Sequence, residues 1–258
     1  MKHKVRMVIT IIALLLFPII MNFLSPVLPI VGAMDGIIVG SLMLFAAMFV
    51  TGIFFGRAWC SWLCPMSALG DLCIMANSKA VNVNKLRTVR FVIVAVWAAA
   101  LVAGFVLAGG IKGADFLYMT ESGISVDMPI KYVIYYTVLI LFFVTNITVG
   151  KRGACHSYCW MSPFLAGGYH FGKLLKVPQL RIKANTDKCT DCGKCSNACP
   201  MSIPVSTALK QRCIDTSDCI LCGECVKSCS KTVLSFGIRK AANISRIAQS
   251  AEPKHDAL

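Results

Sequence analysis

The first part of the chain alternates long apolar segments with short polar ones. Four of the apolar segments are long enough to cross about 30 Å of hydrocarbon as helices, because a helix rises about 1.5 Å per residue. They cover Met7–Leu24, Gly36–Phe55, Val89–Gly109 and Tyr132–Val149. Their only Lys, Arg, Asp or Glu is Arg90, at the start of the third segment. The pattern therefore predicts four transmembrane helices.

The pattern changes after Leu180. Lys, Asp, Asn, Ser and Cys dominate the rest of the chain, and short β-like runs such as Thr232–Ile238 replace the apolar segments. From Ala241 the chain is polar without a core pattern, so we expect a loose helix or a flexible tail. The predicted organisation is an α-helical membrane domain at 1–180, a small α+β domain at 181–240 and a polar tail at 241–258.

Composition agrees with a membrane protein. Apolar residues make up 57% of the chain and charged residues 15%, with a mean hydropathy of +0.70. A net charge of +14 would suggest nucleic-acid binding in a soluble protein. Here the Lys and Arg residues gather at the ends of the apolar segments, where they set membrane topology. We therefore expect no nucleic-acid partner.

The basic residues also predict an orientation in the cytoplasmic (inner) membrane. On one side lie Lys2, Lys4, Arg6, Arg57, Lys79, Lys85, Arg87, Arg90, Lys151 and Arg152. The opposite loops hold Lys112 and Lys131, which three acidic residues offset. Both termini and the small domain are therefore expected in the cytoplasm. The first segment is expected to stay as an anchor, because it is long for a signal peptide and no A-x-A site follows it.

An internal repeat links the second and fourth segments. The second ends in Gly56-Arg57-Ala-Trp-Cys60-x3-Cys64-Pro-Met-Ser, and the fourth in Gly150-Lys-Arg-Gly-Ala-Cys155-x3-Cys159-Trp-Met-Ser. One inserted residue aligns the two. The repeat predicts a duplicated two-helix unit whose copies share one orientation, with both Cys pairs at the cytoplasmic surface.

The strongest chemical signal lies in the small domain. It contains Cys189-x2-Cys192-x2-Cys195-x3-Cys199-Pro and then Cys219-x2-Cys222-x2-Cys225-x3-Cys229. This spacing is the two-cluster ferredoxin pattern, in which the fourth Cys of each run binds the other cluster. The pattern predicts Cys189, Cys192, Cys195 and Cys229 as the ligands of one 4Fe–4S cluster, cluster 1, and Cys219, Cys222, Cys225 and Cys199 as those of the other, cluster 2.

Details around the two runs fit cluster binding. Gly193 and Gly223 each follow the second Cys and can adopt positive φ, so backbone N–H groups can point at the sulfurs. The fourth Cys of each run is expected to open a helix leading to the other cluster. A zinc ribbon is the alternative, but two runs of four Cys fit paired zinc knuckles poorly.

The four remaining paired cysteines are candidate ligands of a third iron–sulfur centre. Cys60 and Cys64, like Cys155 and Cys159, are expected at positions i and i+4 of one helix face, with Cβ atoms about 5–6 Å apart. That separation suits two ligands of one metal centre better than a disulfide. A thiol–disulfide relay between the copies and free buried thiols remain open as alternatives.

Several other residues are weaker candidates. Cys73 and Cys213 lie outside both patterns and are expected to be structural thiols. His156 and His170 could ligate a metal or hydrogen-bond a quinone, but no histidine lies within the four segments. Trp59, Trp62, Trp160 and Tyr169 are expected to anchor the helices at the membrane interface.

Over nearly its whole length the chain resembles the membrane iron–sulfur proteins of NapH and NosR type. The matching residues are Gly56-Arg57-x-Trp59-Cys60-x3-Cys64-Pro65, the second C-x3-C and the two ferredoxin runs in that order. The chain departs from the family at Cys159-Trp160, where Cys-Pro is usual, and at Ser230, where the ferredoxins usually have Pro. It lacks the long flavin-binding domain of the NosR branch, so no flavin is expected.

The resemblance implies electron transfer between a quinone pool and partner redox proteins. The expected function is a non-catalytic, quinol dehydrogenase-like subunit of a larger oxidoreductase complex. Its expected partners are other membrane subunits, a soluble or peripheral electron donor or acceptor, and a quinone. The alternative is an accessory factor that reduces metal or thiols while a respiratory metalloenzyme assembles.

Overall fold

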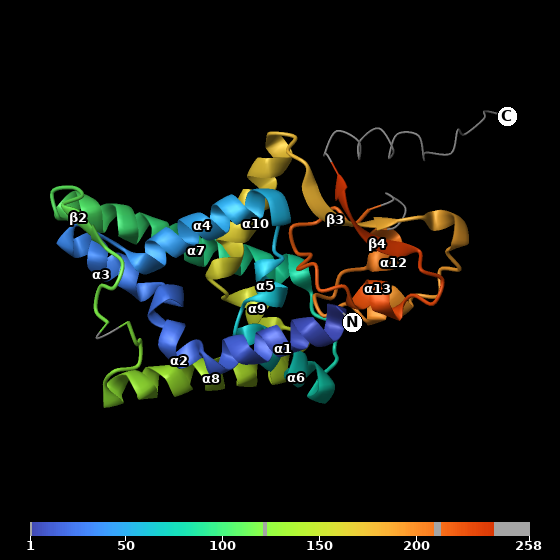
Figure 1. Ribbon diagram of the computed structural model, residues 1–258, viewed down its shortest axis with the longest axis horizontal. Helices are drawn as coiled ribbons and strands as arrows, with labels where there is room; N and C mark the ends of the chain where they lie inside the picture. The colour runs from blue at the N-terminus through green and yellow to red at the C-terminus, as the bar shows by residue number, and fades with distance from the viewer. Residues whose placement is uncertain (1, 121–122, 209–212, 240–258) are drawn as a thin grey trace.

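The computed structural model describes residues 2–120, 123–208 and 213–239, so the tail predicted at 241–258 lies outside the described residues. A helical body and a smaller cysteine-rich unit lie end to end along the long axis of the molecule (Figure 1). The helical body contains α1 (Lys2–Leu15), α2 (Phe17–Ile20), η1 (Asn22–Leu24), α3 (Val27–Asp35), β1 (Ile37–Val39), α4 (Gly40–Phe55), α5 (Trp59–Trp62), α6 (Met66–Ala76), α7 (Val83–Leu107), β2 (Gly113–Asp115), α8 (Pro129–Val149), α9 (Gly153–Ser157) and α10 (Met161–Leu174). The cysteine-rich unit contains β3 (Gln179–Ala184), η2 (Thr186–Lys188), α11 (Lys194–Asn197), α12 (Val205–Ala208), α13 (Glu224–Ser228) and β4 (Leu234–Arg239).

Two of the four expected spans correspond to long apolar helices. Within the described residues, Leu86–Leu107 of α7 and Pro129–Val149 of α8 are long and apolar enough to cross a membrane. Only 11% of the apolar window of each helix is buried inside the protein. The other apolar segments form shorter helices, so the structure shows two candidate spans where the sequence predicts four.

The first expected span, Met7–Leu24, is interrupted. The helix α1 ends at Leu15, and Pro18 stands in the first turn of the short helix α2. Proline has no backbone N–H and fits only the first turn of a helix, so a new helix begins there. The second expected span is also shortened, because Ile37–Val39 forms a parallel ladder with Gly113–Asp115 before the 16-residue helix α4.

Glycines allow α4 and α10 to cross closely. A Cβ at Gly52 would lie 2.7 Å from the backbone oxygen of Leu165, and one at Gly168 would lie 2.1 Å from that of Phe49. Small residues at such a crossing let two helix backbones approach. The crossing places the end of α4, which leads into the first cysteine motif, beside α10, which follows the second.

The cysteine-rich unit is closed by a two-stranded antiparallel sheet. Gln179 pairs with Arg239 and Ala184 with Leu234, so β4 returns to the place where the chain left the helical body. Buried side chains of this unit, including Met201 and Ile220, belong to the same apolar core as Met48 and Leu165 of the helices. The two parts therefore share one core instead of meeting through a linker.

Candidate metal centres

The first ferredoxin-type set lies at the outer end of the molecule. Cys189, Cys192, Cys195 and Cys229 line one pocket together with residues near the start of β4. Cys189 and Cys192 are exposed, whereas Cys195 is buried. The fold thus brings Cys229 of the second run to the three cysteines of the first, as crossed ligation requires.

The second ferredoxin-type set lies deeper. The thiols of Cys199, Cys219 and Cys222 lie close enough to act electrostatically on Cys225, so the four expected ligands of cluster 2 are neighbours. Burial raises the pKa of Cys219 to about 12 and that of Cys222 to about 11. Such thiols stay protonated near neutral pH unless a cation holds the thiolate.

The loops between these cysteines repeat one backbone conformation. Gly193 and Gly223 have φ of +71° and +79°, as expected, and the residues before the second Cys, Asp191 and Leu221, also have positive φ, at 48° and 53°. When right-handed and left-handed backbone conformations alternate along a loop, successive N–H groups point into one concavity that can bind an anion. The side chain of Leu221 offers no sequence signal for this conformation, so sequence reasoning missed it.

Backbone N–H groups point at the sulfurs as a cluster requires. Leu221, Glu224 and Val226 donate to Cys219, Cys222 and Cys225, respectively. Hydrogen bonds to cluster sulfurs stabilise the bound anion and tune its potential. The residues present therefore fit a cubane cluster at this site.

One expectation about these runs is wrong. The fourth Cys does not open a helix, because Cys199 follows the short helix α11 and Cys229 is the C-cap residue of α13. The third Cys of each run, Cys195 or Cys225, lies inside these helices. Positive φ at Gly193 and Gly223 starts the helices earlier than expected, and each is only one turn long.

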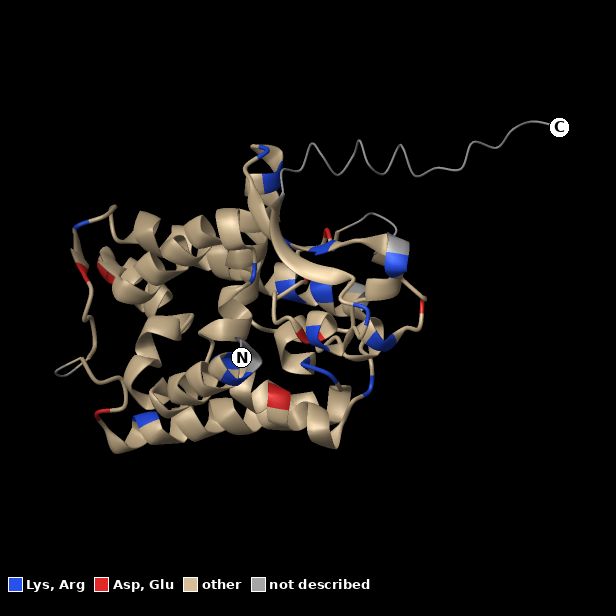
Figure 2. Ribbon diagram, turned by 45° about the vertical axis from the view of Figure 1, so that its right-hand side comes forward, with Lys and Arg blue, Asp and Glu red and all other residues tan. Residues whose placement is uncertain are grey.

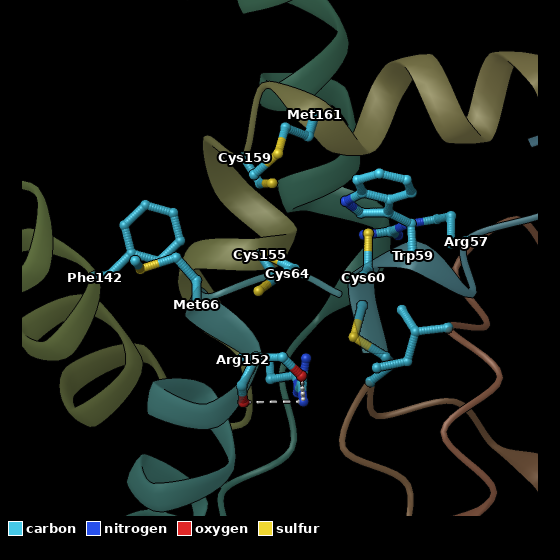
Figure 3. Close-up of a pocket in the computed structure, with 13 residues that line it drawn as sticks. Arg57, Trp59, Cys60, Cys64, Met66, Phe142, Arg152, Cys155, Cys159 and Met161 are labelled. Carbon is cyan, nitrogen blue, oxygen red and sulfur yellow. Dashed lines mark hydrogen bonds between the residues drawn. The ribbon is translucent and has the colours of Figure 1, made fainter. Parts of the chain in front are cut away.

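The two C-x3-C motifs converge on one pocket at the ends of α4 and α8. Cys60 and Cys64 from the first motif line it together with Cys155 and Cys159 from the second. Figure 3 shows the four cysteines on α5, α9 and the turns that follow them. The structure thus brings together the four side chains that the internal repeat predicts as a third centre.

The expected i, i+4 placement on one helix face is wrong. The helix α5 ends at Trp62, before Cys64, and α9 ends at Ser157, before Cys159. Cys64 precedes Pro65, and the proline ring disfavours helical backbone in the residue before it. In each pair the first Cys therefore lies in the helix and the second lies beyond its end, so helix geometry does not set the distance between them.

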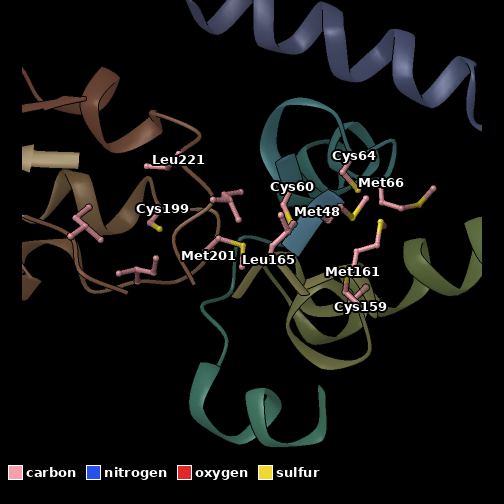
Figure 4. Close-up of a cluster of buried hydrophobic side chains, with 14 of the residues drawn as sticks. Met48, Cys60, Cys64, Met66, Cys159, Met161, Leu165, Cys199, Met201 and Leu221 are labelled. Carbon is pink, nitrogen blue, oxygen red and sulfur yellow. The ribbon is translucent and has the colours of Figure 1, made fainter. Parts of the chain in front are cut away.

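Methionines and a part of the cysteine-rich unit complete this pocket. Met66, Met161 and Met201 line it, as does Ile220, which precedes Leu221 in the second ferredoxin run. Figure 4 shows Met201 between Cys199 on one side and Cys60 with Met48 on the other. The candidate third centre and the second ferredoxin-type set are therefore separated by a thin layer of buried apolar side chains.

Buried arginines surround the C-x3-C pocket, and sequence reasoning missed their role. Arg57 and Arg152 line the pocket, and Arg90 lies close to it; each is 1% exposed. Arg152 donates to Ser67 Oγ at 2.9 Å and to Asp71. In the sequence these arginines stand at the ends of apolar segments and indicate only membrane topology. Their burial became visible only in the fold. Their charge fits an anionic group in the pocket.

His156 is buried beside the same arginines. Burial, together with the positive charges of Arg57 and Arg90, lowers its pKa to about 3, so its ring is neutral. Neither ring nitrogen has a hydrogen-bond partner among the residues that the structure describes. His156 does not line the C-x3-C pocket. Its predicted role as a ligand is not supported by its position.

The other candidates lie away from the cysteine sets. Cys73 and Cys213 are buried and line none of the cysteine pockets described here. His170 is exposed at the surface of α10. Tyr169, expected as a membrane anchor, is buried instead and hydrogen-bonds Asp215 and Arg181. Trp62 and Trp160 also donate to backbone oxygens of other segments, namely Leu221 and Leu24.

An apolar cavity of about 500 Å³ adjoins the C-x3-C pocket. It lies between the segment from α2 to α3 and the helix α8, and it shares three lining residues with the pocket, Met66, Phe142 and Met161. Lys131 lies at its other end, near the start of α8. The cavity therefore runs along α8, away from the cysteines.

The spacing of the cysteines is unlike a site for a single ion. In residues 2–120, 123–208 and 213–239, no group of three His, Cys, Asp or Glu could hold one metal ion. A tetrahedral zinc site with bonds of about 2.3 Å would need its sulfurs roughly 3.8 Å apart.

Comparison with known proteins agrees with iron–sulfur sites in both halves. Residues 37–79 match the family model described as a 4Fe-4S binding domain, and residues 181–230 match the one described as a 4Fe-4S dicluster domain. The first match contains Cys60 and Cys64, and the second contains both ferredoxin runs. The chain thus carries two ferredoxin-type 4Fe–4S domains.

Similar curated proteins have names that refer to electron transport or to ferredoxins. YccM of Escherichia coli K12 is 26% identical over 83% of this chain. The methylamine utilization ferredoxin-type proteins MauN of Methylorubrum extorquens and Methylobacillus flagellatus are 24% and 25% identical over 72% and 68% of it. The chain spans 60%, 63% and 60% of the length of these three relatives. No solved structure matches it significantly.

Proposed function

We propose that the chain is a membrane-bound electron-transfer subunit with three iron–sulfur centres in a row. The observation that carries the proposal is the spatial order of the three cysteine sets. The exposed set around Cys189 lies outermost, the set around Cys219 lies deeper, and the C-x3-C set lies at the helix ends next to the apolar cavity. We call the last of these the helix-end set: Cys60, Cys64, Cys155 and Cys159.

The ligands follow the crossed pattern. Cys189, Cys192, Cys195 and Cys229 hold cluster 1, whereas Cys219, Cys222, Cys225 and Cys199 hold cluster 2. When bound, each cluster supplies a one-electron redox site. The protein's part is to hold the second and third sites close together: Met201 and Ile220, each one or two residues from a cluster 2 ligand, line the helix-end pocket.

The membrane part of the proposal rests on α7 and α8. A core helix of a soluble protein would be mostly buried, and a signal sequence would lie near the N-terminus, but these two helices fit neither description. Their surfaces expose Val96, Val102, Ile134 and Ile140, each more than half exposed. In Figure 2 charged residues gather on the cysteine-rich unit, while the helices between the two ends carry few. With both termini in the cytoplasm, as the distribution of Lys and Arg predicts, the three centres lie on the cytoplasmic side of the inner membrane.

A quinone is the proposed electron partner in the bilayer. The cavity between α2 and α8 is almost entirely apolar, is large enough for a substituted ring, and touches the helix-end pocket through Met66, Phe142 and Met161. Trp160 forms part of its wall, with Nε1 bonded to Leu24 O at 2.7 Å. A ring bound there would lie one side chain from the helix-end set.

Iron analysis tests the helix-end centre. The Cys60→Ser, Cys155→Ser double variant should lose the third centre, so iron should fall from about twelve to about eight atoms per chain, and one low-temperature EPR signal should disappear. Cys73→Ser is the matched control, because it removes a buried thiol that lines no cysteine pocket. Unchanged iron and signals in a folded double variant would refute the third centre.

A cavity-filling variant tests the quinone site. Val138 lines the cavity, so Val138→Trp should slow oxidation of the reduced clusters by duroquinone at least about tenfold, a barrier increase of about 1.4 kcal/mol. Val133→Trp, on the exposed face of the same helix, should leave the rate unchanged. Equal rates for both variants would exclude this cavity as the quinone site.

The methionines of the helix-end pocket favour a second candidate function. Four thiols with Met66, Met161 and Met201 form a soft sulfur site of the kind that selects Cu(I). An accessory factor that reduces metal or thiols during assembly of a metalloenzyme would use such a site. About eight irons per chain with bound copper would favour this function, whereas about twelve irons without copper would favour electron transfer.

A further inference from the structure

Arg57 lies between the helix-end set and the second ferredoxin-type set. It follows Gly56, whose φ of +53° ends the helix α4, and its side chain is fully buried. The guanidinium lines the helix-end pocket and lies near Cys60 and Cys159. On its other side it is near enough to Cys219 to act on that thiol electrostatically. Arg57 therefore faces two proposed centres at once.

The positive charge of Arg57 is poorly compensated by protein groups. Its Nη1 lies 3.5 Å from Asp218 Oδ1, but Arg90 and Arg87 share the same carboxylate at 3.2 and 3.6 Å. Two of its nitrogen atoms, Nε and Nη2, have no hydrogen-bond partner within the described part of the chain. A buried guanidinium in this state is costly unless an anion accompanies it.

A cluster with four thiolates is such an anion, because the thiolates outweigh the positive charge of its core. Adding an electron makes it more negative, so a fixed positive charge beside it stabilises the reduced form. The effect falls with distance and is strong in a buried site. Arg57 lines the helix-end pocket, whereas its carboxylate partner, Asp218, precedes Cys219 of the second set.

We infer that Arg57 is a positioning residue that raises the reduction potential of the helix-end centre above the value it would otherwise have, and raises it more than that of cluster 2. The inference rests on the proposed function and adds a direction to it. Arg57 lines the helix-end pocket, whereas the carboxylate next to Cys219 is already shared with Arg87 and Arg90. A higher potential at the helix-end centre favours electron flow from cluster 2 toward the membrane.

Redox titration of the purified full-length protein, followed by EPR, tests this inference. Arg57→Gln should make reduction of the helix-end centre at least tenfold less favourable, which is 59 mV for one electron, and should shift cluster 2 less. Arg57→Lys keeps the charge and should retain most of the potential. Arg181→Gln is the matched control: it removes another buried arginine, which pairs with Asp215 and lies outside the helix-end pocket.

A purely structural role for Arg57 would lower stability without this pattern of potentials. If Arg57→Gln does not fold, Arg57→Met removes the charge but keeps an unbranched side chain in the buried space, and Asp218 stays paired with Arg87 and Arg90. Arg57→Met should still lower the helix-end potential relative to that of cluster 2. Equal potentials in wild type and either variant, with the iron retained, would overturn the inference. Unchanged iron and EPR signals in the folded Cys60→Ser, Cys155→Ser double variant would instead refute the proposed function.

Discussion

At the scale of single residues, the spacing of the cysteines in the sequence indicates which of them can bind a cluster together. The two ferredoxin runs predict which four thiols meet, and the pocket around Cys189 and Cys229 has that composition. Arginine carries no such signal. Arg57, Arg90 and Arg152 read as topology markers in the sequence, yet the fold buries them around the helix-end pocket. Their role depends on which surface covers them, and that is decided by contacts distant in sequence.

The proposed crossed ligation gives a prediction for one residue. Cys199 belongs to the first run but lies beside Cys219, Cys222 and Cys225. Cys199→Ser should therefore damage cluster 2 and leave cluster 1 largely intact, as measured by EPR and iron content. Cys213→Ser, which removes a buried thiol outside both runs, should affect neither cluster. Selective loss of cluster 1 in Cys199→Ser would show that the crossing is wrong.

At the scale of elements, the length of the apolar segments located α7 and α8 within a few residues. It failed where local chemistry breaks a helix. Pro18 divides the first apolar segment, and a short parallel ladder takes the beginning of the second. The helices that carry Cys60 and Cys155 end before the second Cys of each motif. Segment length alone cannot show such breaks.

The close crossing of α4 and α10 gives a prediction about the stability of the fold. Gly168→Ala would place a methyl group 2.1 Å from Phe49 O, so the helices must separate. Overpacking of this kind costs about 1–3 kcal/mol or more. We expect a clear fall in the thermal unfolding temperature in detergent, with loss of the helix-end centre.

Its neighbour Gly167 provides the control. A Cβ there meets only the ring of Phe49, at 3.3 Å, which can shift. Gly167→Ala should therefore change the unfolding temperature much less than Gly168→Ala. Similar effects of the two substitutions would mean that the close backbone approach does not stabilise the fold.

At the scale of the whole molecule, buried charges tie the cysteine-rich unit to the helices. Arg6 of α1 bonds Asp71 of α6 at 2.9 Å and Glu224 of α13 at 2.8 Å. Lys151 donates to Asn197 O at 2.6 Å. These contacts hold the cysteines of the second ferredoxin-type set against the helix-end set, so the distance between the two cysteine sets is a property of the assembled fold.

The proposed orientation predicts where each end of the molecule lies. A green fluorescent protein fused after Leu258 should fluoresce, and alkaline phosphatase fused there should be inactive, because both report a cytoplasmic location. A protease site inserted beside Lys112, between α7 and α8, should be cut in intact spheroplasts. Active phosphatase at the C-terminus together with an uncut site would reverse the topology and move every centre to the other side.

The sequence alone determined the features that depend on short-range spacing. These are the two ferredoxin runs, the repeat that pairs Cys60 with Cys155, the glycines with positive φ, and the two long apolar helices. Only the tertiary structure decided which groups from distant segments share a buried space. It brought Met201 and Ile220 to the helix-end set, Asp218 to Arg57, and the apolar cavity to Met66 and Phe142. Spacing along the chain limits what neighbouring residues can bind together, whereas burial and long-range electrostatics arise only when separate elements pack.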